Sequence, residues 1–178
     1  DKILPMYASG KLVKSNPDFW AARAMISYPG KMDRGIFSIY FFNLVRLNAG
    51  QAIFQGAGVP HAYLEGQNIE LMSNSDNVLR GGLTPKHIDV PELMKHIRFE
   101  AVYPVIMDGE GDQIECRYIC PVPDFSLSKI NITAGSIYEF TASGPEMLFV
   151  LEGQGEAEGT GTWILNKGQA FFVGNGEK

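Results

Sequence analysis

The second half of the chain consists of short apolar stretches that are separated by turn sequences at regular intervals. The turns include Asp108–Gly111, Ala134-Gly135 and Asn166–Gly168, whose glycine, aspartate and asparagine residues favour chain reversal. Many short strands at this spacing predict an antiparallel sandwich or barrel. The segments expected to be strands are EAVYPVIM, IECRYICPV, FSLSKINIT, SIYEFTA, EMLFVLEG, GEAEG, TWILN and AFFVG.

Another β region precedes this one and begins at about residue 36. Residues 41–55 (FFNLVRLNAGQAIFQ) are predicted to form two strands joined by Asn48-Ala49-Gly50, with the glycine supplying a positive φ. Residues 91–99 (PELMKHIRF) are predicted to form a short helix between the two β regions. Two β units separated by a helix indicate a mainly β, double-barrel architecture with a few short helices, each barrel being a jelly roll.

The first 35 residues have a different pattern. Residues 16–28 (NPDFWAARAMISY) begin with Asn16 as a candidate N-cap and Pro17 at the first helical position, which predicts a short helix. The residues on its predicted apolar face are Phe19, Ala22, Met25 and Ile26. Another part of the protein must cover this face, so the sequence is expected to begin partway through a larger protein.

The charge of the chain argues against two classes of binding partner. The formal net charge is −5 at pH 7, and charged residues make up 20% of the sequence. No basic field is available to attract a nucleic acid or a membrane surface, so any bound phosphate must be held by a few placed cations. The apolar runs are too short to span a membrane, and no secretory leader is visible.

The two cysteines, Cys116 and Cys120, lie four positions apart in the sequence CRYIC. In a strand this spacing corresponds to about 13 Å, which is too far for a disulfide. A zinc pair would need two further soft ligands nearby, and none is evident in the sequence. Both cysteines are therefore expected to be reduced thiols of a cytoplasmic protein.

Residues 56–86 carry many polar and glycine residues in a pattern too irregular for one helix. Arg80 and Lys86 could together bind a phosphate monoester, the arginine as a bidentate fork and the lysine as a point charge. Alternatively, both are solvated surface cations, and Asp76 is an ordinary turn residue. His61, taken alone, is more often a structural residue than a metal ligand, and the sequence has no local histidine motif of a zinc site.

Between residues 61 and 93 the chain contains the runs HAYL-x-G, IE-x-M, SDNV-x-R-x-GLTPK and D-x-x-x-L, in this order. This region closely resembles the signature region of the type I phosphomannose isomerases (mannose-6-phosphate isomerases), and the resemblance covers roughly the whole chain. It implies a bicupin fold, in which double-stranded β-helices form jelly-roll sandwiches. It also implies a zinc-dependent enzyme that interconverts mannose 6-phosphate and fructose 6-phosphate through a cis-enediol.

The resemblance assigns roles to individual residues. His61 matches the C-terminal zinc ligand of the family, and Arg80 matches the residue most directly assigned to catalysis. Tyr63, Asp76 and Lys86 match residues that line the substrate site. A zinc ion would polarise the sugar oxygens, and a guanidinium beside them would stabilise the developing charge without losing a proton.

The chain also departs from the family pattern, because it lacks the Gln-x-His pair and the upstream glutamate that supply the other zinc ligands. It is therefore expected to be a C-terminal fragment: residues 1–35 the tail of a helical insertion, 36–100 the C-terminal part of the catalytic cupin, and 101–178 a truncated second cupin-like domain. The N-terminal portion of the same polypeptide would supply the missing ligands, and this fragment alone would be inactive. The alternative is a non-catalytic cupin module that binds sugar phosphates.

Overall fold

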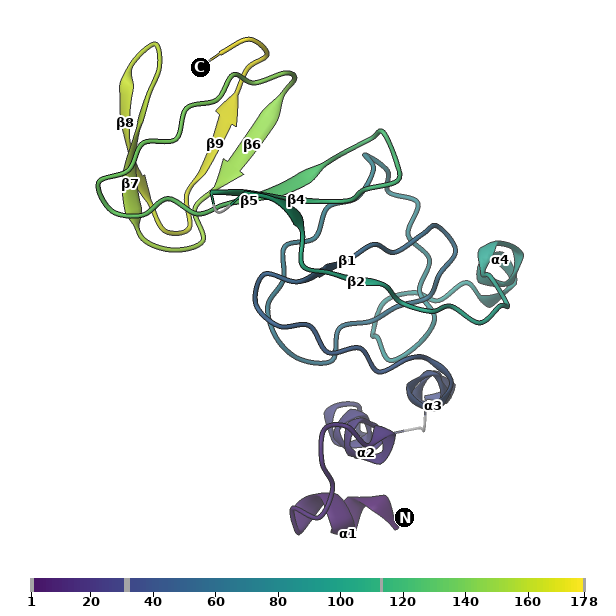
Figure 1. The fold of residues 1–178 in the computed structure, drawn as a ribbon. Helices are drawn as coiled ribbons and strands as arrows, with labels where there is room; N and C mark the ends of the chain where they lie inside the picture. Colours follow the sequence, from purple (N-terminus) through teal and green to yellow (C-terminus); the bar gives the residue numbers. More distant parts are fainter. Residues whose placement is uncertain (1, 31–32, 113, 178) are drawn as a thin grey trace. The chain divides into compact units, whose positions relative to one another are not determined.

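The structure is a computed structural model that describes residues 2–30, 33–112 and 114–177. The chain divides into two compact units, Asp1–Lys129 and Ile130–Lys178 (Figure 1). The helical elements are α1 (Ile3–Ala8), α2 (Pro17–Ser27), the 3-10 helix η1 (Arg34–Phe37), α3 (Ser38–Phe41) and α4 (Val90–His96). The strands are β1 (Ala52–Ile53), β2 (Ile106–Met107), β3 (Glu110–Gly111), β4 (Glu115–Tyr118), β5 (Leu127–Ile130), β6 (Glu146–Phe149), β7 (Gln154–Glu158), β8 (Thr162–Asn166) and β9 (Ala170–Val173). The assignment of the chain to an insertion and two cupin domains stays a prediction.

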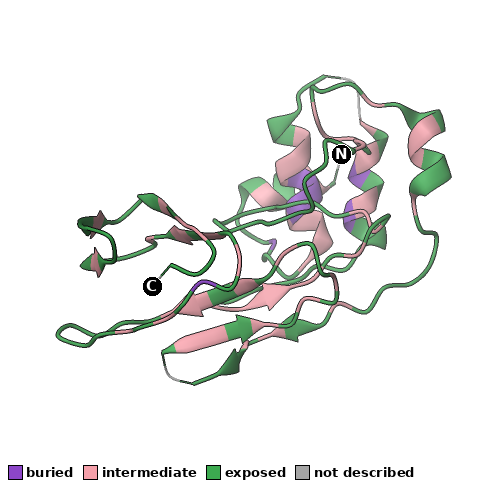
Figure 2. Ribbon diagram, turned by 90° about the horizontal axis from the view of Figure 1, so that it is seen from above, coloured by how far each residue is buried: buried purple, intermediate pink, exposed green. Residues whose placement is uncertain are grey.

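The buried core of the first unit lies among its helices, where the buried residues are concentrated in Figure 2. Trp20 and Ala21 of α2 pack with Ile36 of η1 and Ile39 of α3, and all four residues are buried. The indole Nε1 of Trp20 donates a hydrogen bond to the carbonyl oxygen of Lys14 (2.7 Å), so its one polar atom is satisfied. The helices of the first unit thus pack around a small apolar core.

Helix α2 begins where the sequence predicts, and its buried surface includes most of the predicted apolar face. The side chain of Asn16 accepts a hydrogen bond from the backbone N–H of Asp18 (2.9 Å), as an N-cap does. Of the predicted face, Ala22 is buried and Phe19 and Met25 pack against the core. Ile26 is instead 57% exposed, and Trp20 and Ala21, which lie outside the predicted face, are buried. The prediction was wrong at these positions because α2 contacts α1, η1 and α3, so its covered surface is wider than one helical stripe.

Residues 34–41 are helical, although β structure was predicted to begin at about residue 36. The 3-10 helix η1 is capped by Asp33, whose Oδ1 accepts a hydrogen bond from the backbone N–H of Gly35 (2.7 Å). Ile36 and Ile39 lie three positions apart and both reach the core. The run IFSIYFF is apolar enough for a strand, but its isoleucine spacing also suits a helical turn, and packing favours the helix.

The predicted hairpin over residues 41–55 does not form. Its turn is present, with Gly50 at φ 87°, but β1 pairs in antiparallel orientation with β2. Among the described residues, 41–47 form no strand, and the side chain of Asn43 donates a hydrogen bond to the carbonyl oxygen of Val102 (2.7 Å). Both arms of the turn therefore contact the chain that follows α4, and this is why they do not pair with each other.

The strands beyond residue 100 follow the prediction closely, since every expected segment contains a strand except residues 136–142. The strands β3, β4 and β5 form one sheet, β6 pairs with β9, and β7 pairs with β8. In the antiparallel β6–β9 pair, Leu148 lies opposite Phe171 and both are half-buried, whereas Met147 and Phe172 are both 67% exposed. This alternation is typical of a sheet with one covered face. The predicted class, short strands with a few short helices, is confirmed.

Two further sequence predictions concern the thiols and membrane association. Cys116 and Cys120 are both free, as expected, and Cys116 donates a hydrogen bond to the carbonyl oxygen of Asp108 (3.3 Å). Over the described ranges of the chain, none of the helices has the length and apolar character needed to cross a membrane.

Candidate functional site

His61 follows Pro60 in an exposed segment without regular secondary structure. Its ring Nδ1 lies 2.9 Å from the carbonyl oxygen of Val59, and this partner selects the tautomer in which Nδ1 donates and Nε2 keeps its lone pair. A backbone carbonyl at one ring nitrogen is typical of histidines that bind metal through the other. His61 therefore has the chemistry of a zinc ligand.

A complete metal site is not present within the part of the chain that the structure describes. These residues contain no group of three or more His, Cys, Asp or Glu side chains that could hold a metal ion. A catalytic zinc site needs three protein ligands and one open position. Among the described residues, His61 could supply one ligand of a zinc ion, and the remaining ligands would have to come from elsewhere.

Tyr63 lies next to His61, with the ring centroids 6.2 Å apart. Its pKa is raised to about 12, mainly by partial burial and further by the nearby carboxylate of Glu70, whereas Asn68 lowers it. Although 63% of the residue is exposed, the phenol keeps its proton well above neutral pH. Tyr63 can therefore donate a hydrogen bond to an oxygen of a ligand.

Asp76 lies in a turn of the long connection between β1 and α4. Its carbonyl oxygen accepts a hydrogen bond from the N–H of Val78 (2.8 Å), and the hydroxyl of Ser75 accepts one from the N–H of Asn77 (3.1 Å). Its exposed carboxylate has no hydrogen bond or ion pair with another described residue. The backbone of Asp76 thus serves the turn, while its carboxylate is available to a ligand.

Arg80 and Lys86 stand at the two ends of a glycine-containing segment, Arg80–Lys86, which we call the 80–86 loop. Arg80 is half-buried and Lys86 is exposed. No acidic side chain among the described residues forms an ion pair with either cation. A phosphate could bind to both without displacing a carboxylate of the same chain.

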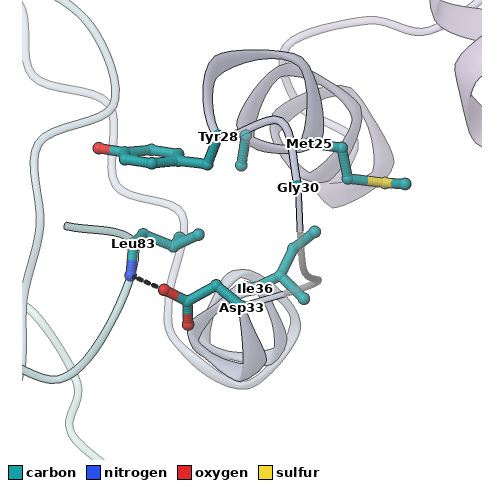
Figure 3. A pocket seen from close by; sticks show the side chains of 7 residues that line it. Met25, Tyr28, Gly30, Asp33, Ile36 and Leu83 are labelled. Atoms are coloured by element: carbon teal, nitrogen blue, oxygen red, sulfur yellow. Dashed lines mark hydrogen bonds between the residues drawn. The ribbon is translucent and has the colours of Figure 1, made fainter. Parts of the chain in front are cut away.

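The middle of the 80–86 loop is bonded to the helical core through Asp33 (Figure 3). Oδ2 of Asp33 accepts a hydrogen bond from the backbone N–H of Leu83 (2.7 Å), while Oδ1 accepts the one from Gly35 (2.7 Å). The backbones also touch, because a Cβ built on Gly82 would lie 2.9 Å from Cα of Gly35. The loop is therefore fixed at its centre to the start of η1.

A cavity of about 120 Å³ lies between α2, η1 and the 80–86 loop (Figure 3). The residues that line it are Ala24, Met25, Tyr28, Gly30, Asp33, Ile36 and Leu83. None of the residues predicted to bind zinc or substrate lines it, and ligand sites for small molecules have volumes of about 300–1,000 Å³. The cavity is a packing gap behind the loop.

The segment that carries His61 and Tyr63 is connected to the helices by Glu65. Its carboxylate forms ion pairs with Lys14 and with Nη1 of Arg23 (2.5 Å). These hydrogen bonds lower the pKa of Glu65, that from Lys14 more than that from Arg23. All three side chains are at least 41% exposed, so solvent screens the pairs and their net contribution to stability is small.

The five site residues predicted from the sequence form two groups. His61 lies beside Tyr63, and Arg80 shares a loop with Lys86, but no hydrogen bond or ion pair between described residues joins the two groups. Asp76 lies between them in sequence. Their assignment to zinc, substrate and catalysis stays a prediction.

The sequence patterns did not single out Asp33. Its position before Arg-Gly is typical of an N-cap and could have predicted the hydrogen bond to Gly35. Nothing local in the sequence predicts its second partner, Leu83, because that contact joins residues 50 positions apart.

The curated proteins that are similar in sequence to this chain include mannose-6-phosphate isomerases from several organisms, although no family model matches the chain. The chain is 38% identical over 144 residues to mannose-6-phosphate isomerase 2 of Arabidopsis thaliana, covering 79% of this chain and 33% of the relative. It is 39% identical over 163 residues to mannose-6-phosphate isomerase of Escherichia coli, covering 89% and 41%. The chain thus spans about a third to two fifths of the length of these relatives.

Solved structures agree with the sequence relatives. A mutant of phosphomannose isomerase from Salmonella typhimurium matches 99% of this chain and 50% of its own with a TM-score of 0.71 and 31% identity. The same enzyme bound to its substrate, fructose 6-phosphate, and to zinc matches 97% of this chain and 49% of its own, with a TM-score of 0.70. The fold is therefore of the β-rich cupin class, as predicted. The chain is homologous to a portion of the mannose-6-phosphate isomerases, and the predicted resemblance to their C-terminal portion is confirmed.

Proposed function

We propose that this chain is part of a zinc-dependent aldose–ketose isomerase that interconverts mannose 6-phosphate and fructose 6-phosphate. The observation that supports the proposal best is the 80–86 loop, which is bonded to the helical core and carries a cation at each end. Neither cation forms an ion pair with an acid among the described residues. Homology to the mannose-6-phosphate isomerases selects the substrate for such a site. The proposal concerns the whole protein, because the chain spans less than half of these relatives.

In this proposal one residue of the chain binds the phosphate of the substrate and three contact its sugar. Lys86 binds the phosphate as a point charge. Arg80 stabilises the negative charge that develops on the sugar oxygens as the proton next to the carbonyl is removed, and it does so without losing a proton of its own. Tyr63 donates a hydrogen bond to a sugar hydroxyl, and Asp76 orients a second hydroxyl through its free carboxylate.

His61 supplies one ligand of the zinc ion through Nε2, and the N-terminal portion of the same polypeptide supplies the others. When bound, the zinc provides a Lewis acid that polarises the oxygens of the substrate. The free thiols Cys116 and Cys120 support a reducing compartment, and we place the protein in the cytoplasm.

A second function has one observation in its favour. The described residues hold no cluster of three metal-binding side chains, so a chain of this composition could bind sugar phosphates without catalysis. Such a module would need only the 80–86 loop and its neighbours, and its binding would survive removal of metal.

The test measures isomerisation of mannose 6-phosphate by the purified full-length protein, before and after treatment with a chelator and after zinc is restored. We expect turnover that is lost with the chelator and recovered with zinc, whereas the separate 178-residue chain should show none. Binding of mannose 6-phosphate that persists in the chelator, together with no turnover under any condition, would instead establish the non-catalytic module.

A further inference from the structure

We infer that Asp33 is a positioning residue that holds the 80–86 loop in the conformation in which Arg80 and Lys86 meet the sugar phosphate. The inference rests on the proposed function, and it adds a residue outside the predicted site. Asp33 itself is half-buried and lies 50 positions before Leu83, the residue that it binds in the loop.

The carboxylate of Asp33 has two separate partners. Oδ1 caps η1 through the N–H of Gly35, and Oδ2 accepts the N–H of Leu83, both at 2.7 Å. Hydrogen bonds to an ionised carboxylate are stronger than those between neutral groups. A cap needs only one of the two oxygens, so the second bond is explained by the loop and not by the helix.

Leu83 needs such a bond because of its backbone conformation. Its φ of 50° lies in the left-handed region, which is unfavourable for a residue with a side chain and persists only where the surroundings hold it. Two contacts do so here: the hydrogen bond to Asp33, and the packing of the leucine side chain against the core cluster of the helices. Without the hydrogen bond, only the side-chain packing opposes relaxation of Leu83 to an ordinary backbone conformation.

The two cations depend on this conformation. Arg80 lies three positions before Leu83 and Lys86 three positions after it, so a change of φ at the centre redirects both ends of the loop. The contact between Gly35 and Gly82 brings the two backbones together at the same point, where no side chain fits. The carboxylate thus acts on the site through the loop, without touching substrate.

The experiment compares Asp33→Ser with Asp33→Asn and with a control, Asp18→Asn, in the full-length protein. Serine is a good N-cap and preserves the bond to Gly35, but its single hydroxyl is too short to bridge to Leu83. Asp18 is a carboxylate of the same helical region that accepts a hydrogen bond from the hydroxyl of Tyr40 (2.8 Å). Its loss leaves the 80–86 loop untouched.

We expect kcat/KM for mannose 6-phosphate to fall by about tenfold to a hundredfold in Asp33→Ser and Asp33→Asn, with KM raised as well as kcat lowered. A variant that merely loses folded protein would lower the apparent kcat and leave KM unchanged. Hydrogen exchange of the Leu83 amide should become faster in both variants, and Asp18→Asn should match the wild type. In an Arg80→Ala background, Asp33→Ser should lower kcat by a smaller factor, because the misplaced guanidinium is then absent.

If Asp33→Ser has the same KM, the same kcat and the same rate of hydrogen exchange at Leu83 as the wild type, the inference is overturned and Asp33 is only a helix cap. If the proposed function itself is wrong, the result is different, because the wild type then shows no isomerisation. In that case the dissociation constant for mannose 6-phosphate replaces the kinetic constants, and an unchanged value in Asp33→Ser would overturn the inference. Absence of binding by the wild type would overturn both.

Discussion

The rings of His61 and Tyr63 meet edge to face, with their centroids 6.2 Å apart and their planes at 71°. One residue separates them, so an extended backbone carries both side chains on the same side of the chain. A histidine with a free Nε2 and a phenol that keeps its proton are thereby adjacent.

The His61→Ala variant of the full-length protein should contain less zinc than the wild type, because it loses the nitrogen proposed to bind the metal. We expect at least about a tenfold loss of zinc affinity, as follows from removing one protein ligand of the metal. Metal content after equilibration with a zinc buffer measures the effect. His96→Ala is the matched control, since His96 is exposed and contacts Glu92 (2.9 Å) on α4. Equal zinc content in the two variants would remove His61 from the metal site.

Tyr63 should titrate late, with a pKa of about 12 against the ordinary value of 10. Because the folded state binds this proton more tightly than the unfolded state, the stabilisation is complete below pH 10 and is lost as the pH rises towards 12. The ultraviolet absorbance of tyrosinate follows the titration, and its difference from Tyr63→Phe isolates this residue.

Glu70→Gln should lower the pKa of Tyr63 but keep it above 10, since burial is the larger cause and the carboxylate the smaller one. Tyr103→Phe removes a tyrosine that is 86% exposed and should leave the late component of the titration intact. A pKa for Tyr63 that is unchanged by Glu70→Gln would contradict the contact between the phenol and this carboxylate.

Arg80→Ala in the full-length protein should lower kcat for isomerisation by about a hundredfold to a thousandfold, which is the usual effect of removing one group that stabilises transition-state charge. Steady-state kinetics measures this loss, and the melting temperature should change little, because Arg80 has no ion pair with a described acid. Arg98→Ala is the control: Arg98 is exposed and pairs with Glu100 (3.7 Å). A large loss of melting temperature with normal kcat would assign Arg80 to the fold.

Ile39→Ala should destabilise the helical core by about 2–4 kcal/mol, because it removes a buried side chain and leaves a cavity. Ile26→Ala should change the free energy of unfolding by no more than about 0.5 kcal/mol, since Ile26 is 57% exposed. Urea denaturation followed by the fluorescence of Trp20, which packs against Ile39, measures both. Equal effects of the two substitutions would place the core elsewhere.

Short-range features of this fold were predictable from the sequence. Asn16 caps α2, and Gly50 has a positive φ, because both depend on a few neighbouring residues. The strands beyond residue 100 were predicted from turn residues and alternation, which are also local. The site residues became recognisable only as a long motif, because each polar residue alone has an ordinary structural explanation.

Long-range pairings were not predictable in the same way. Residues 41–47 have the composition of a strand, yet Asn43 bonds to Val102 and β1 pairs with β2, on the far side of α4 in sequence. Ile36 and Ile39 suit a strand or a helical turn equally, and only their contact with Trp20 decides between them. The bridge from Asp33 to the 80–86 loop likewise depends on tertiary packing and has no local pattern.

The close approach of Gly35 and Gly82 has a consequence for natural variation. A methyl group at either position would lie about 3 Å from the opposite backbone, so neither glycine can change alone without moving the loop. In a set of aligned homologous sequences, these two distant columns should therefore vary together, and a change at one should be tolerated only with a compensating change nearby. Selection for the orientation of Arg80 and Lys86 would then also act on this pair of glycines, neither of which has a side chain that could contact a ligand.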